Sequence, residues 1–265
     1  MKRTLALVLA GLLLAVACAS AETLRIGMEC DYAPFNWTQA EPSDTAVPIA
    51  SGGYADGYDV RIAKLVAEGL GMELEVVKTA WDGLPMAVMS GDIDAIIAGM
   101  SPTAERQQTL DFTDPYYESE LVVVVRADSP YAAAKSLADL SGGKITGQLN
   151  TFHYSVIDQI PGVAKETAME SFPAMIVALT SGAIDGYVSE RPGALAAVGA
   201  NPNLTFVTFD EGAGFTASPE DVAVAVGLKK GSELTAKINE VLAGISKEQR
   251  QEIMDGAIAA QPLSE

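Results

Sequence analysis

The chain has 265 residues, 49% of them hydrophobic and 20% charged, and its formal net charge is −18. This length has room for one large domain or for two modest ones. A protein that binds nucleic acid needs a basic surface, so the acidic charge argues against nucleic acid as a partner.

The first 21 residues are typical of an export signal. Lys2 and Arg3 precede an apolar run over residues 5–17 that is too short to span a membrane. An A-x-A signal-peptidase site ends at residue 21, and a weaker lipoprotein box ends at Cys18. We predict a signal peptide at residues 1–21 and a protein exported to the periplasm, with a lipid anchor on Cys18 as the alternative. Once Cys18 is removed, Cys30 is the only cysteine, so no internal disulfide is expected.

Alternating strand and helix patterns follow this segment. We predict a strand at residues 24–28, a long surface loop at 38–57, a helix at 58–70 that ends at Gly71, and a strand at 73–77. This alternation is typical of a mainly parallel sheet built from βαβ units.

The stretch from Trp81 to Arg126 contains residues that could bind a ligand. It predicts an amphipathic helix that ends at residues 90–91, a buried strand at 93–98, and a new helix opened by Ser101-Pro102, with Arg106 one turn in. A strand end followed by a helix N-terminus favours an anion. A guanidinium can hold a carboxylate through two parallel hydrogen bonds. The corner therefore predicts a site for a small carboxylate.

The same pattern occurs a second time. Residues 90–99 read SGDIDAIIAG and residues 181–190 read SGAIDGYVSE, so Gly99 aligns with Glu190 at an offset of 91 residues. We interpret the repeat as two lobes of like topology. Because ligands of open α/β sheets bind at the carboxyl ends of strands, a cleft between the lobes would set Arg106 and Ser101 against Glu190. A cation for a carboxylate and an anion for an ammonium predict an amino-acid site.

The rest of the chain completes the second lobe and returns to the first. We predict strands at 121–125, 144–148, 203–209 and 222–226, helices at 155–160 and 172–181, and two closing helices, the second capped by Ser246 with Gln249. The crossings between lobes are expected at 115–119 and 210–215. Lobe 1 would comprise residues 22–116 and 211–265, and lobe 2 residues 117–210.

These signals together resemble the extracytoplasmic solute-binding proteins of polar amino-acid ABC transporters, bacterial solute-binding protein family 3. The resemblance covers residues 24 to about 244, and its motifs are weak alone but specific in combination and order. They are Tyr32-x-Pro34-Phe35, Gly57-Tyr58-Asp59-Val60, Trp81-Asp82-Gly83-Leu84, Gly91-x-Ile93-Asp94-Ala95, Gly99-Met100-Ser101-x-Thr103-x-Glu105-Arg106, and Asp111-Phe112-Thr113-Asp114-Pro115-Tyr116-Tyr117.

The resemblance implies the type II periplasmic binding protein fold, an α/β fold of two lobes joined by two hinge crossings. It also implies roles by position. Arg106 and backbone N–H groups would hold the α-carboxylate, Glu190 the α-ammonium, and two aromatic rings the ligand side chain, whose tip Glu29 and Gln148 would face. The full expected set is Glu29, Tyr32, Trp81, Ala98, Gly99, Ser101, Arg106, Gln148, Thr151, Phe152 and Glu190.

Glu29 decides the expected substrate. Arg106 and Glu190 balance the two charges of a zwitterion, so a further carboxylate in the cleft favours a ligand with a cationic side chain, arginine or lysine. The Glu29-x-x-Tyr32 spacing and Gln148 resemble arginine-binding members. In the alternatives, Glu29 hydrogen-bonds the amide of glutamine, pairs with a lysine of the protein, or serves a site for histidine or another polar amino acid.

Several positions depart from the family pattern or allow another role. Glu190 stands where Asp is usual, and residues 149–152 replace a small Gly-Thr-Thr turn, so Phe152 would fill space or stack on the ligand. In the alternative interpretation, Tyr32 and Trp81 are core residues. Arg106 can be a surface residue paired with a nearby acid.

A protein of another class remains possible on the same fold, because a prephenate- or arogenate-type dehydratase resembles this architecture. We expect no enzyme, no cofactor and no metal, since no nucleophile-elbow, zinc or phosphate-loop motif is present and His153 is the only histidine. The expected partners are a free amino acid and the permease subunits of an ABC importer in the membrane. The protein itself is expected to be a monomer.

Overall fold

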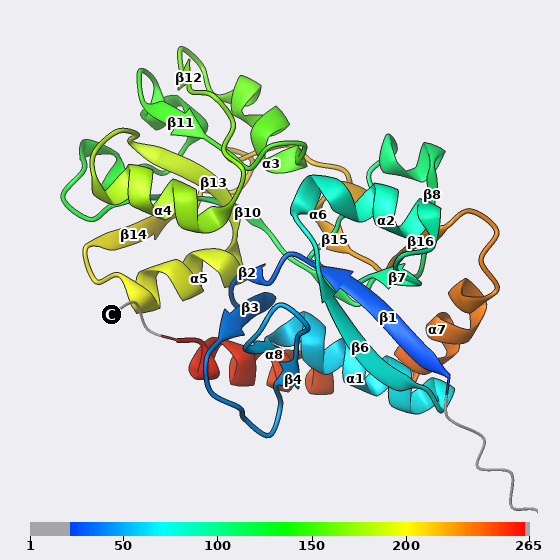
Figure 1. The fold of residues 1–265 in the computed structure, drawn as a ribbon. Helices are drawn as coiled ribbons and strands as arrows, with labels where there is room; N and C mark the ends of the chain where they lie inside the picture. Colours follow the sequence, from blue (N-terminus) through cyan, green and yellow to red (C-terminus); the bar gives the residue numbers. More distant parts are fainter. Residues whose placement is uncertain (1–21, 263–265) are drawn as a thin grey trace, which may run out of the picture.

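The computed structural model describes residues 22–262 and shows two sheets in separate lobes (Figure 1). The predicted signal peptide and its alternative lipid anchor lie outside the described residues. Among residues 22–262, no helix is long and apolar enough to cross a membrane.

The sheet of the first lobe has five strands, of which only β16 runs opposite to the others. Their order is β6 (Glu73–Lys78), β1 (Thr23–Met28), β7 (Ala95–Ile96), β16 (Gly227–Lys229) and β8 (Leu110–Phe112). The apolar residues of β1 recur at every second position and are buried, as its pattern predicts.

The sheet of the second lobe repeats this arrangement, and only β10 runs opposite to the others. Its order is β12 (Ala164–Lys165), β11 (Lys144–Thr146), β13 (Gly186–Glu190), β10 (Leu121–Arg126) and β14 (Leu204–Val207). Ile96 pairs with Gly27 in one sheet, and Tyr187 pairs with Thr146 in the other. Because residues 96 and 187 are 91 apart, the internal repeat is confirmed by register.

Helices flank both sheets. The longer ones are α1 (Tyr58–Leu70), α2 (Leu84–Ser90), α4 (Phe172–Thr180), α5 (Arg191–Ala200), α7 (Leu234–Ala243) and α8 (Lys247–Ala260), and the short ones are α3 (Phe152–Ser155) and α6 (Pro219–Val222). The predicted helix at 58–70 is confirmed, ending at Gly71 with φ 68°. The capping box of Ser246 and Gln249 begins α8 as predicted.

The region 38–57 differs from the predicted loop. It contributes to a small antiparallel sheet of β2 (Asp31–Tyr32), β3 (Asn36–Gln39), β5 (Tyr54–Asp56) and β4 (Val47–Pro48). The Asp56 carboxylate accepts hydrogen bonds from Ser43 and Thr45 and pairs with Arg61 at 3.2 Å. These side-chain contacts, between residues 5 to 13 positions apart, give a polar segment a fixed shape.

The predicted helix at Ser101-Pro102 is wrong. Residues 101–103 form no regular element, and only a 3₁₀ turn at Arg106–Gln108 follows. Thr103 Oγ1 accepts a weak hydrogen bond from the Arg106 N–H at 3.4 Å, and β8 begins at Leu110. So few residues cannot repay the cost of nucleating a stable helix. An anion site at this corner would therefore depend on Arg106 itself and not on a helix dipole.

The two lobes are joined by a two-stranded antiparallel ribbon, β9 (Tyr117–Glu118) against β15 (Ala223–Val224). β9 leads into β10 of the second lobe, and β15 leads into β16 of the first lobe. Each of these is the strand that runs opposite to the others in its sheet. The lobe boundaries stay a prediction; β9 lies within residues 115–119, where the first crossing is expected. Backbone hydrogen bonds tie Asp210 to Lys135 and Ala213 to Leu137, so residues 210–213 pack on the second lobe, and we place the return crossing later.

The hydrophobic core reaches through both lobes. Val122 and Val124 of β10 belong to a cluster that extends into the first lobe, whereas Val123 and Val125 face a second cluster on the other side of the sheet. This alternation follows from the two-residue period of a strand. All four side chains are buried because β10 is covered on both faces.

Candidate ligand-binding site

The strand ends of the two lobes meet at one point. Glu29 lies two residues after Gly27 and Gln148 two residues after Thr146, so they occupy equivalent positions in the pairing of the two sheets. The Gln148 Nε2 donates to Glu29 Oε2 at 3.1 Å. Around this contact lies a cavity of about 10 Å³, roughly the space of one water. It is lined by Tyr32, Trp81, Gly99, Ser101, Arg106, Gln148, Thr151, Phe152 and His153.

Eight of the eleven expected residues line this cavity. Glu29 is in contact with Gln148, which does line it. Ala98 is buried directly before Gly99, and Glu190 is buried with its Oε1 3.5 Å from His153 Nε2. The structure therefore brings the expected set together from both lobes. His153 lines the cavity as well, although the sequence pattern assigns it no role. Its one signal was its place directly after Phe152, in the turn that departs from the family.

Arg106 faces the second lobe. Its guanidinium donates to the Ser101 carbonyl and to the Asn150 carbonyl, both at 2.9 Å, and lies 5.0 Å from the centre of the Trp81 ring. The side chain is half-buried, and loss of solvent lowers its pKa to about 10, so it remains a cation at neutral pH. The alternative pairing with a nearby acid is not what this geometry shows.

Glu29 is a buried carboxyl group with one hydrogen-bond partner. Burial raises its pKa to about 7, against the opposing effect of the hydrogen bond from Gln148. Glu29 Oε1 has no hydrogen-bond partner among the described residues. The nearest lysine charge that acts on it, Lys78, bonds to Asp31 at 3.3 Å instead. The cleft thus holds an acidic group without a cation.

Tyr32 is covered on both faces of its ring. Phe35 stacks on one side at 4.9 Å and Phe172 of the other lobe stacks at 4.1 Å, measured between ring centres. The expected sandwich of a ligand side chain between Tyr32 and Trp81 therefore requires Phe172 to move away, and it stays a prediction. Gly99, with φ 63°, packs against Tyr32: an added Cβ would lie 3.0 Å from the ring.

The turn that departs from the family pattern holds the lobes together. Asn150 adopts the left-handed conformation, φ 56°, which asparagine tolerates better than most residues. Its side chain donates to Asp82 Oδ1 at 2.9 Å, and its carbonyl accepts from Arg106. Thr151 Oγ1 closes the turn by donating to the Gln148 carbonyl at 2.7 Å.

An open groove leads outward from the small cavity. It has a volume of about 810 Å³ and shares Trp81, Arg106, Thr151 and Phe152 with the cavity. Residues of both lobes form its walls. The groove is therefore the solvent-facing mouth of the cleft.

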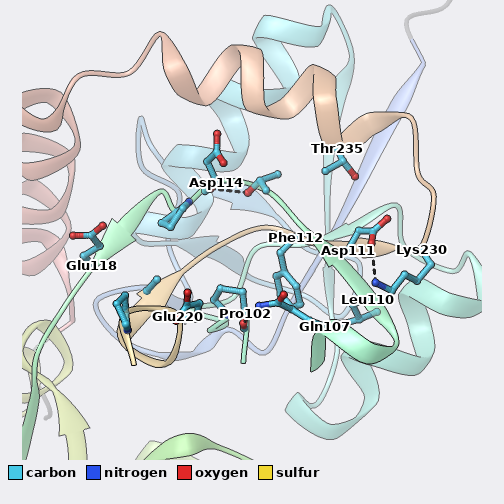
Figure 2. Close-up of a pocket in the computed structure, with 14 residues that line it drawn as sticks. Pro102, Gln107, Leu110, Asp111, Phe112, Asp114, Glu118, Glu220, Lys230 and Thr235 are labelled. Carbon is cyan, nitrogen blue, oxygen red and sulfur yellow. Dashed lines mark hydrogen bonds and ion pairs between the residues drawn. The ribbon is translucent and has the colours of Figure 1, made fainter. Parts of the chain in front are cut away.

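A second hollow of about 460 Å³ lies in the first lobe (Figure 2). It is bordered by residues 107–115, by 219–223 and by the start of α7, and none of the expected residues lines it. Two of its charges neutralise each other, since Lys230 pairs with Asp111 at 3.0 Å. Lys230 is the one basic side chain that lines this hollow, and it is paired, so the hollow offers no unpaired cation for a carboxylate and the cleft is the candidate ligand site. Among residues 22–262, no group of three acidic, histidine or cysteine side chains is placed to hold a metal.

Replacing Glu29 by Gln is expected to stabilise the ligand-free protein above neutral pH. Folding raises the pKa of Glu29 from 4.5 to about 7. The protein therefore loses folding stability as the pH rises from the pKa of the unfolded state to the pKa of the folded state. The gain in the free energy of unfolding should be near zero at pH 4, grow up to pH 7, and level off at about 3 kcal/mol at most. Chemical denaturation at several pH values measures it. Glu68→Gln, on the exposed part of α1, is the matched control and should show no such growth.

A family model, "Bacterial extracellular solute-binding proteins, family 3", matches residues 24–256. The chain therefore belongs to the family 3 bacterial extracellular solute-binding proteins, and the resemblance found in the sequence is confirmed. It is a solute-binding protein and not an enzyme, which disfavours the dehydratase alternative.

Several proteins of known class are similar to this chain. The "ABC transporter arginine-binding protein 1" of Escherichia coli K12 is 29% identical over 90% of this chain and 92% of its own length. The "Probable histidine-binding protein" of Neisseria gonorrhoeae is 28% identical over 86% and 80%. The crystal structure of an amino acid ABC transporter substrate-binding protein from Streptococcus pneumoniae bound to L-arginine superposes with a TM-score of 0.77, at 26% identity over 89% and 94%. The two-lobe type II fold is thereby confirmed.

Proposed function

We propose that this protein binds a free L-amino acid with a cationic side chain, arginine or lysine, between its lobes and delivers it to an ABC importer. The observation that carries the proposal is the buried Glu29 carboxyl at the meeting of the strand ends, which has no cationic partner among the described residues. A buried charge of this kind is costly unless it is paired. A ligand guanidinium or ammonium supplies the missing partner.

The two charges common to all amino acids have counterparts in the same place. Arg106 supplies the cation for the α-carboxylate, in exchange for the carbonyl bonds it makes now. Glu190, at the end of β13, supplies the anion for the α-ammonium. With Arg106 and Glu190 paired to the α-carboxylate and the α-ammonium, Glu29 is free to pair with the ligand side chain. A cationic side chain then brings the total charge of these three residues and the ligand to zero.

Binding requires the lobes to separate and close again. In this structure they touch through Gln148 and Glu29, through Arg106 and Asn150, and through the stacked rings of Tyr32 and Phe172, with room for about one water. The ribbon of β9 and β15 is the place where the backbone can bend. A ligand that bridges both lobes would stabilise the closed form by its differential contacts.

The relatives support an amino-acid ligand but differ in which one, since their names give arginine and histidine. Glutamine, histidine or another polar amino acid is therefore the alternative ligand for the same role. The family is extracytoplasmic. We further propose that the exported protein is a monomer in the periplasm that docks on permease subunits, with a lipid anchor at Cys18 as the other possible form.

Calorimetric titration tests the ligand. The protein is unfolded, freed of bound ligand, refolded and titrated with L-arginine, L-lysine, L-histidine and L-glutamine. We expect arginine or lysine to bind with micromolar affinity, about −8 kcal/mol, and glutamine to give no heat. Binding of glutamine alone would keep the receptor and overturn the cationic ligand. No heat from any of the twenty amino acids would overturn the receptor itself, and prephenate would be titrated next.

A further inference from the structure

His153 stands between the ligand cavity and Glu190. The imidazole lines the cavity, whereas Glu190 is 1% exposed and does not. His153 Nε2 lies 3.5 Å from Glu190 Oε1, and the other oxygen, Oε2, has no hydrogen-bond partner among residues 22–262. A ligand ammonium therefore cannot reach the carboxylate unless the imidazole gives way.

Among residues 22–262, the His153 imidazole is the basic side chain within ion-pair distance of Glu190. The negative charge of Glu190 acts on Tyr32, Asp59 and Tyr117, all of them neutral or acidic groups. Arg191, the next residue, pairs with Glu120. Arg106 bonds to carbonyls, and Glu29 faces Gln148. From α4, the apolar Phe172 ring meets His153 edge-on, with 6.1 Å between the ring centres.

We propose that His153 is the internal counter-ion of Glu190 in the ligand-free protein and that the α-ammonium of the ligand displaces it. This inference rests on the proposed function and adds to it a residue that sets affinity. With the cleft empty of ligand, a protonated imidazole neutralises Glu190. When the ligand arrives, its ammonium takes over the carboxylate, and the imidazole loses its proton to solvent because its anionic partner is taken.

The sign of the pH dependence follows from this exchange. One proton leaves His153 for each α-ammonium bound, so affinity rises with pH through the range in which imidazoles titrate, between about pH 5 and 8. At the acidic end of this range the contribution of His153 alone should change the affinity by up to about tenfold per pH unit, because one imidazole proton is released per ligand. The longer Glu at position 190 matters here, since its carboxyl group extends one methylene further from the strand towards the imidazole.

The single histidine makes a direct test possible. The protein is produced without a histidine tag, and the imidazole signal is followed by NMR as a function of pH in the ligand-free state. We expect Glu190→Gln to lower the midpoint of this titration by about one pH unit or more. Glu29→Gln removes another buried cleft carboxyl that contacts Gln148 and is the matched control; it should shift the midpoint much less. An unchanged midpoint in Glu190→Gln would overturn the proposal.

The ligand provides the second arm of the test. Saturating L-arginine should lower the midpoint in the wild-type protein, whereas 5-guanidinopentanoate, which lacks the α-ammonium, should not. In calorimetry at pH 6, His153→Gln should bind arginine more tightly than the wild type. The Glu29→Gln variant should still gain affinity for arginine between pH 6 and pH 8. Adding His153→Gln to that variant should remove most of this gain. Weaker binding by His153→Gln at every pH would contradict displacement.

The two proposals fail in different ways. If no amino acid binds but Glu190→Gln still shifts the imidazole, the ion pair exists, while the proposed function and the displacement are wrong. If arginine binds and leaves the imidazole midpoint unchanged, the proposed function stands and the displacement by the ammonium is wrong.

Discussion

Arg106→Ala should reduce the affinity for every amino acid ligand by about a hundredfold to ten-thousandfold. In the proposed site the guanidinium at the cavity holds the ligand carboxylate, and two charge-assisted hydrogen bonds contribute about 3–6 kcal/mol, or two to four powers of ten in affinity. Arg106→Lys should recover only part of the loss, because an ammonium cannot make two parallel bonds to a carboxylate. Isothermal titration with the preferred ligand measures both variants.

A surface arginine of the same lobe provides the control for this experiment. Arg25 pairs with Asp94 at 2.6 Å, away from the cavity, so Arg25→Ala should keep wild-type affinity even if stability falls. Thermal melts of all three variants separate lost binding from lost folding. Micromolar affinity retained by Arg106→Ala would remove this residue from the carboxylate role.

Glu29→Gln should weaken cationic ligands selectively, by roughly 10- to 100-fold, while any affinity for glutamine stays within about threefold. Gln keeps the size of the side chain and can still bond to Gln148, so only the charge is lost. In the wild type, the loss of the Glu29 proton also predicts tighter binding of a cationic ligand above pH 7, where the group is ionised, than below it. This contribution of Glu29 should be absent in the variant, which keeps only the pH dependence proposed for His153. An equal loss for glutamine and arginine would contradict the side-chain assignment.

Much of the fold could be predicted because its signals are local. The helix at 58–70 has an apolar face and a terminal Gly71 in the left-handed conformation, both readable from a few residues. The repeat between residues 81–99 and 172–190 predicted two sheets of like topology, and the strand order confirms it. The strand ends then placed Glu29 opposite Gln148, and the hydrogen bond between them joins the two lobes.

Where predictions failed, constraints between neighbouring segments decided the structure. The helix expected at Ser101-Pro102 did not form, because the chain must reach β8 within a few residues. The polar segment 38–57 became a small sheet because Asp56 collects side chains from Ser43 to Arg61. No local pattern contains these constraints.

The sequence by itself determined the class of protein, the two-lobe topology and most of the residues around the cavity, because periodicity, turn residues and motif order are properties of short segments. Only the tertiary structure decided how those residues meet. It set Phe172 on the ring of Tyr32, left Glu29 without a cation among the described residues, and put His153 in front of Glu190. Each of these contacts joins side chains from different parts of the chain, and which partner a buried ring or charge acquires depends on how the lobes close.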